Sequence, residues 1–150
     1  MATREQVYTK FGITAEAAQL LETELGTLLL AQCGLENRFW DKSKCLEATQ
    51  ALQEINESTL GRVLQRVKEK SQVSAELETA LREGLKIRNR LFHSFYRDHD
   101  MRIQTDEGRD LMMADLEDMH QKLFHAYQLA GAMSSLALRI VLEMKAEDAA

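Results

Sequence analysis

The segment Arg88–His93 carries the side chains whose types and spacing best suit chemistry. Arg88 stands in an apolar helical stripe where a leucine is expected, and a charge there needs a partner or a path to solvent. Asn89, His93 and Tyr96 follow one another at steps of four and three residues. These three therefore lie along one neighbouring helix face and present an amide, an imidazole and a phenol. We predict that the functional site lies on this segment.

Arg88 and His93 are not expected to point in the same direction. They are five residues apart, so on a helix their side chains diverge by about 140° at about 100° per residue. One copy of the helix cannot easily aim both side chains at one small ligand. A second copy, related by a two-fold axis, can bring them together, and we therefore expect a homodimer.

The surroundings of this segment are basic, although the net charge of the chain is −5. The basic residues between positions 82 and 102 are Arg82, Lys86, Arg88, Arg90, Arg97 and Arg102, against Glu83, Asp98 and Asp100. A dimer doubles this patch, which can attract a phosphate backbone despite the acidic total. The predicted substrate-binding residues are Lys86, Arg90, Tyr96 and Arg97.

This arrangement resembles the signature of the HEPN superfamily. In that signature an arginine precedes a histidine by four to six intervening residues, late in a helix of an all-α domain, and a polar residue directly follows the arginine. Arg88, Asn89 and His93 fit the version with four intervening residues. The run Thr59–Leu64, with the leucines after it, is similar to the lead-in of such domains. The resemblance covers residues 14–130.

The resemblance implies a metal-independent endoribonuclease that acts as a homodimer, with Arg88, Asn89 and His93 catalytic and no cofactor. The residue types suit that chemistry, because a histidine can serve as the base or the acid and an arginine can neutralise phosphate charge. Asn89 could hold His93 or a phosphate oxygen by hydrogen bonding. The resemblance also implies a toxin–antitoxin or defence setting, with RNA and an antitoxin or nucleotidyltransferase protein as partners. The alternative is a non-catalytic helical dimerisation module that binds a protein or nucleotide.

The elements that position these residues are expected to be helices throughout. Proline is absent and there are only 7 glycines, whereas hydrophobic and charged residues make up 45% and 29% of the chain. We predict an all-α, up-and-down bundle of four to five helices with a long C-terminal helix. Residues 1–150 are expected to form a single domain with a core over residues 14–144 and a frayed tail over residues 145–150.

The expected helices follow from capping residues and apolar spacing. The helix starts are placed at Thr14, near Ser43, at Ser58 or Thr59, at Ser74 and at Thr105. The first helix is expected to end at Cys33, where Gly34 offers a stop, and the polar run 97–105 is expected to end the fourth. Two alternatives stay open: the second and third pieces can be one interrupted helix, and the last helix can be kinked near Gly131.

Other features exclude several classes of protein. Cys33 and Cys45 are too few for a disulfide scaffold and are expected to be reduced thiols. The N-terminal residues lack the apolar core of a signal peptide, and no run approaches the roughly 18 to 20 apolar residues of a membrane helix. We therefore expect a cytoplasmic protein with no membrane partner.

Two further clusters contain possible metal ligands. Glu117 and His120 have the Glu-x-x-His spacing of di-iron bundles, but such sites need a second copy of the pattern and further carboxylates. Asp98, His99 and Asp100 are interpreted as a charged loop. No metal site is predicted.

Overall fold

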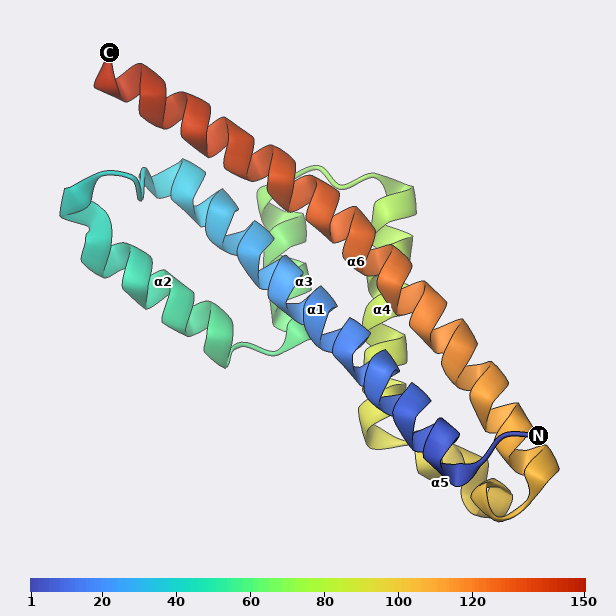
Figure 1. The fold of residues 1–150 in the computed structure, drawn as a ribbon. Coiled ribbons are helices and arrows are strands. Elements are labelled where there is room, and N and C mark those ends of the chain that lie inside the picture. The colour runs from blue at the N-terminus through green and yellow to red at the C-terminus, as the bar shows by residue number, and fades with distance from the viewer. The chain divides into compact units, whose positions relative to one another are not determined.

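The computed structural model describes residues 1–150, and its regular structure is entirely helical (Figure 1). The α-helices are α1 (Arg4–Asn37), α2 (Cys45–Glu57), α3 (Leu60–Lys70), α4 (Ala75–His93), α5 (Phe95–His99) and α6 (Asp106–Ala149). Two short 3₁₀ helices, η1 (Lys42–Lys44) and η2 (Asp100–Gln104), precede α2 and α6. The prediction of an all-α bundle with a long C-terminal helix is confirmed, because α6 comprises 44 residues.

The chain forms two compact units, and α1 and α6 each contribute residues to both. The first unit comprises Met1–Leu21 and Glu76–Tyr127, and the second comprises Glu22–Ala75 and Gln128–Ala150. The segment Arg88–His93 lies in the first unit. None of the helices is long and apolar enough to cross a membrane.

The core of the first unit joins the N-terminal part of α1, most of α4 and the N-terminal part of α6. Its fully buried side chains are Val7, Leu21, Leu81, Leu91, Phe95, Met112, Leu116, Met119 and Leu123. Gly84 brings α4 close to the other two helices, because a Cβ there would lie 2.9 Å from Cδ2 of Leu21 and 3.1 Å from Cβ of Ala126. The apolar stripe of α4 therefore faces the core, as its spacing predicts.

The second unit is packed less evenly. Leu25, Leu28 and Leu29 of α1 are buried, and α3 buries Leu60, Val63, Leu64 and Val67. In contrast, Ile55 is the only buried residue of α2. Its Cγ2 would lie 3.3 Å from a Cβ at Gly26 of α1, so α2 approaches α1 closely at that point.

Helix α1 is longer at both ends than the sequence predicts. Thr14 does not cap the helix but is buried within it, and its hydroxyl donates to the carbonyl oxygen of Lys10, one turn earlier (2.8 Å). Gly34 does not end the helix either. The left-handed residue after Asn37 is Arg38, at φ 57°, and the amide of Phe39 donates to the carbonyl oxygen of Gly34. A non-glycine residue thus takes the terminating role.

Two predicted caps are confirmed. The hydroxyl of Thr59 accepts from the amide of Arg62, and that of Thr105 accepts from the amide of Gly108 (3.0 Å). The extended backbone at Ser58 and Thr59 separates α2 from α3, so these are two helices. Helix α2 begins at Cys45 rather than near Ser43, because η1 intervenes.

The later chain differs from the prediction at the polar run 97–105. Helix α4 ends at His93, before this run, and the run contains the second part of α5 and all of η2 rather than a charged loop. Helix α6 is continuous through Gly131 and includes residues 145–149. The single domain over residues 1–150, with a core over residues 14–144 and a frayed tail over residues 145–150, stays a prediction.

Gly108, in the first turn of α6, should resist substitution. A Cβ there would lie 2.2 Å from the backbone carbonyl oxygen of Arg102, which cannot move as a flexible side chain can. We expect Gly108→Ala to lower the free energy of unfolding in urea by about 1–3 kcal/mol. Gly12→Ala is the matched control, because a Cβ at Gly12 meets nothing within 4 Å. The control should stabilise by about 0.5–1 kcal/mol through helix propensity. Equal effects of the two substitutions would contradict this account.

Candidate active site at the end of α4

Arg88 lies about one and a half turns before the end of α4 and is half-buried. Its guanidinium lies over the ring of Phe92, with Cζ 5.2 Å from the ring centroid, and its Nη1 donates to Oδ1 of Asn89 (3.2 Å). The arginine side chain therefore extends toward Phe92, one turn further along the helix. Phe92, whose ring the guanidinium covers, is 39% exposed.

Asn89 and His93 are both exposed on α4. His93 is the last residue of the helix, and Ser94 then breaks the helix before α5. The side-chain oxygen Oδ1 of Asn89 accepts from Arg88, so within one chain this side-chain amide orients the arginine. The structure thus brings Arg88 and Asn89 together and places His93 on the surface of the next turn.

Tyr96 lies beyond the break, on α5, and is anchored by aromatic contacts. Its ring centroid is 5.2 Å from those of Phe11 and Phe95, and 40% of the residue is exposed. Burial raises the pKa of the Tyr96 hydroxyl, with a smaller contribution from Tyr8. The phenol is therefore held protonated and can donate a hydrogen bond.

Arg90, which the sequence analysis assigned to substrate binding, is engaged within the first unit. Its Nη1 and Nη2 donate to the two carboxylate oxygens of Asp115 on α6 (2.9 and 2.6 Å), and its Nε donates to Asp98 on α5 (3.2 Å). The hydrogen bonds and charge of Asp115 raise the pKa of Arg90, and Arg90 in turn holds the pKa of Asp115 below its usual value. All three guanidinium nitrogens are therefore occupied, which leaves Arg90 a structural role.

His99 completes this cluster. Only 4% of the residue is exposed, its ring packs 4.6 Å from that of Phe95, and its Nε2 lies 2.6 Å from Oδ2 of Asp115. Its Nδ1 lies 3.2 Å from Nη1 of Arg102. Because a guanidinium only donates, Nδ1 accepts and Nε2 carries the proton that is donated to Asp115. Both ring nitrogens are used, so His99 is a satisfied structural histidine and not a catalytic one.

Local sequence patterns do not reveal the cluster that consists of Arg90, Asp98, His99, Arg102 and Asp115. From the sequence, residues 98–100 are expected to form a charged loop. A signal was present, because His99 follows Phe95 by four residues, at the spacing of the apolar stripe. Asp115 gave no such signal, since its partner Arg90 is 25 residues earlier in the chain.

The basic patch is smaller in the structure than in the sequence. Arg82 pairs with Glu78 (2.7 Å), and Arg90 and Arg102 belong to the cluster around Asp115. Lys86 and Arg97 remain exposed and outside any ion pair.

The other predicted candidates do not form a site. No group of three or more His, Cys, Asp or Glu side chains is arranged to hold a metal ion. Glu117 pairs with Lys10 and accepts from Gln121 (3.0 Å). His120 packs against Phe124, with ring centroids 6.1 Å apart. These residues therefore belong to a helix surface stabilised by local contacts.

Comparison of the chain with protein-family models, with curated proteins and with solved structures gives no match.

We expect Asp115→Asn to destabilise the protein by about 2 kcal/mol, because an amide cannot accept from both Arg90 and His99 as a carboxylate does. Asp118→Asn is the matched control on the same helix. Its carboxylate is exposed and pairs only with Lys122 (2.9 Å), so its loss should cost about 0.5 kcal/mol or less. The measurement is chemical denaturation at pH 7. A cost for Asp115→Asn no larger than that of the control would disprove the central role of the cluster.

The same carboxylate predicts a pH dependence. Arg90 lowers the folded-state pKa of Asp115 below its usual value of 3.8, so the unfolded chain binds this proton more readily. The contribution of Asp115 to stability is therefore fully present above about pH 4 and is lost as the pH falls through the lower folded pKa. The difference in unfolding free energy between wild type and Asp115→Asn should be constant from pH 5 to pH 7 and shrink on further acidification. A difference that grows toward low pH would have the wrong sign.

Proposed function

We propose that the protein is a metal-independent endoribonuclease of the HEPN type that acts as a homodimer. The observation that carries the proposal is the placement of Arg88 and His93 on the last turns of α4, with His93 exposed and the guanidinium of Arg88 over the ring of Phe92. Asn89 holds the arginine, and the neighbouring Arg90 is occupied by Asp115. The segment therefore contains one arginine that is bound to Asp115 and another that lies over Phe92, one residue before the exposed His93.

The proposed reaction is cleavage of RNA by its own 2′-hydroxyl. His93 of one copy takes the proton of the 2′-hydroxyl, the 2′-oxygen forms a bond to phosphorus, and the bond from phosphorus to the 5′-oxygen breaks. A water molecule gives a proton to the departing 5′-oxygen, and a 2′,3′-cyclic phosphate remains. The guanidinium of Arg88 donates hydrogen bonds to the phosphate oxygens as negative charge develops on them.

The proposal requires two copies of α4 in one site, because the side chains of Arg88 and His93 diverge by about 140° on one helix at about 100° per residue. Exposed side chains next to the motif suit either a dimer contact or an RNA contact. Phe92 and Tyr96 are 39% and 40% exposed and offer ring faces on which bases can stack, and Lys86 and Arg97 offer charge. RNA is thus the proposed substrate, with Lys86, Tyr96 and Arg97 as its binding residues. Arg90 is left out of that set.

The first test is RNA cleavage by the purified protein in the presence of a chelator. Cleavage should fall by about 10²–10⁴-fold in His93→Ala and by about 10²–10³-fold in Arg88→Ala. His125→Ala is the matched control, because His125 is another exposed histidine of the first unit and lies outside the motif. Its activity should equal that of wild type. Undiminished cleavage in His93→Ala would reject the assignment, as would folded wild-type protein that cleaves no RNA.

The shared site has a sharper test. Mixing the two inactive variants Arg88→Ala and His93→Ala under conditions of subunit exchange should restore part of the activity. A mixed dimer then contains one site with an intact Arg88 from one copy and an intact His93 from the other. Absence of any restoration, with exchange verified, would show that the two residues act within one chain.

A second candidate function is a non-catalytic interaction module. The exposed apolar side chains of α6 favour it, since Leu136, Leu138 and Leu142 are 57%, 45% and 66% exposed. Such a module, or a toxin of the proposed type, would bind a protein partner such as an antitoxin or a nucleotidyltransferase. A stable complex with the product of a neighbouring gene, together with inactivity toward RNA, would favour this candidate.

A further inference from the structure

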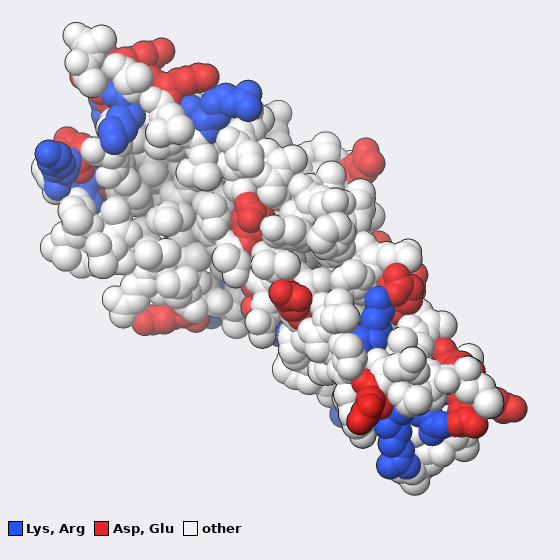
Figure 2. Space-filling view, in the orientation of Figure 1, with Lys and Arg blue, Asp and Glu red and all other residues white.

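An apolar cavity of about 750 Å³, open to solvent, lies within the second unit, between the C-terminal halves of α1 and α6 and the N-terminal part of α2, and its wall residue Leu142 is 66% exposed. Its walls are aliphatic and aromatic, with Leu30, Phe39, Trp40, Leu52, Leu138 and Leu142 among them. The volume falls in the usual range of ligand pockets, about 300–1,000 Å³, which are also mostly apolar. The hollow and largely uncharged surface over α1 and α2 is visible in Figure 2.

The charged residues of this cavity are Asp41, Lys42 and Lys145. Asp41 is committed to the chain, because its Oδ1 accepts from the amide and the hydroxyl of Ser43 (2.9 Å each) and so caps η1. Lys42 and Lys145 take part in no ion pair. The cavity therefore offers two ammonium groups beside an apolar interior, and the one carboxylate there already has its hydrogen-bond partners.

One side of the cavity is fixed and another is adaptable. The carboxylate of Asp148, near the end of α6, accepts from Nε1 of Trp40 (2.8 Å) and pairs with Arg38, so the turn after α1 is tied to α6. Helix α2, the opposite wall, buries only Ile55 and can adjust to a guest at little cost. A fixed aromatic wall facing a loosely held helix suits a flexible apolar chain.

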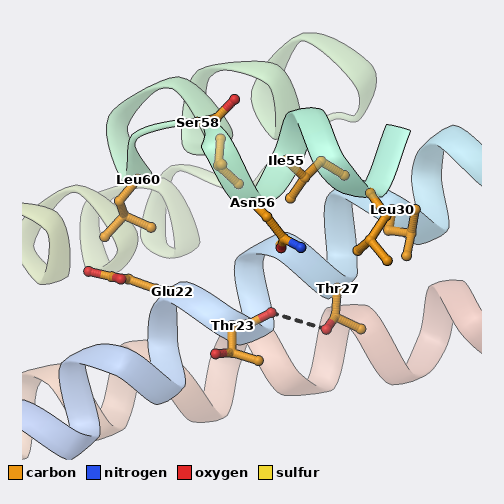
Figure 3. A pocket seen from close by; sticks show the side chains of 11 residues that line it. Glu22, Thr23, Thr27, Leu30, Ile55, Asn56, Ser58 and Leu60 are labelled. Carbon is orange, nitrogen blue, oxygen red and sulfur yellow. Dashed lines mark hydrogen bonds between the residues drawn. The ribbon is translucent and has the colours of Figure 1, made fainter. Parts of the chain in front are cut away.

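A second pocket, of about 310 Å³, lies between α1, α2 and the start of α3 (Figure 3). Its polar side chains are engaged by the chain itself. The hydroxyl of Thr27 donates to the carbonyl oxygen of Thr23 (3.0 Å), and that of Ser58 donates to the carbonyl oxygen of Glu54 (2.7 Å). The larger cavity is therefore the better ligand site.

We propose that this larger cavity binds a medium-chain fatty acid, with its hydrocarbon tail among the apolar walls and its carboxylate at Lys42 and Lys145. The apolar lining supplies affinity of about 0.8 kcal/mol per buried methylene, and the two ammonium groups select an anionic head over a neutral or cationic one. This binding site is separate from the α4 motif and does not depend on the ribonuclease proposal.

Trp40 provides a direct measurement, because it is the only tryptophan of the chain and lines the cavity. Titration with dodecanoate should give a saturable change in tryptophan fluorescence, with weaker binding of dodecanol and of dodecylammonium. As a second readout, dodecanoate should slow alkylation of Cys45, an exposed thiol that lines the cavity, whereas Cys33 is buried.

Three variants test the roles of charge and space. The double substitution of Lys42→Gln with Lys145→Gln should weaken dodecanoate binding about tenfold and leave dodecanol binding nearly unchanged. Lys44→Gln is the matched control, because Lys44 shares η1 but does not line the cavity. Ala48→Phe should fill the cavity from α2 and weaken binding of both ligands.

The proposal fails if no saturable signal is found, or if the double lysine variant keeps the preference for the acid over the alcohol. It also fails if Ala48→Phe, verified as folded, binds dodecanoate as tightly as wild type. A dimer that blocks dodecanoate and dissociates when Leu142→Glu is introduced would show instead that a second copy of the chain covers the cavity.

Discussion

The bidentate ion pair between Arg90 and Asp115 is the interaction on which the candidate site depends. It joins the C-terminal part of α4 to α6, and through Asp98 and His99 the same two residues hold α5. The pair is partly buried, with side-chain exposures of 38% and 22%, and each partner has further hydrogen bonds that compensate for lost hydration. Because α4 is fixed here, Arg88 and His93 have defined directions on either side of Arg90.

Neighbouring residues of the segment 88–95 have different roles, and this explains how polar candidate catalytic residues and core residues occur side by side. Leu91 and Phe95 enter the core, Arg90 binds Asp115, Arg88 lies over Phe92, and His93 is exposed. A helix can assign such neighbours to different faces because successive residues are rotated by about 100°. The motif is thus a composite of packing, anchoring and candidate catalytic positions.

Local patterns in the sequence predicted the fold class and the helix that carries the candidate motif, and non-local contacts account for what they missed. The caps at Thr59 and Thr105 and the stripe of α4 depend on residues a few positions apart, so they could be recognised. Thr14 has the chemistry of a cap, but its surroundings in the first unit bury it inside α1. The role of Arg90 could not be foreseen, because a lone arginine in a basic segment gives no indication of a carboxylate on a distant helix. Residue spacing also failed to predict the position of Tyr96, because the helix breaks at Ser94. Tyr96 therefore lies on α5, whereas Asn89 and His93 lie on α4.

Gly84, in the middle of α4, has a consequence for how precisely the helix directs Arg88 and His93. The close approach of its backbone to Leu21 and Ala126 and the clamp at Arg90 hold the helix at two points, nearly two turns apart. A helix held at two points can neither rotate about its axis nor tilt freely. The directions of Arg88 and His93 are therefore set before any encounter with a second copy. Two copies with side chains already oriented would lose little conformational freedom on association. A larger side chain at position 84 would change the orientation of Arg88 and His93 without contacting either residue.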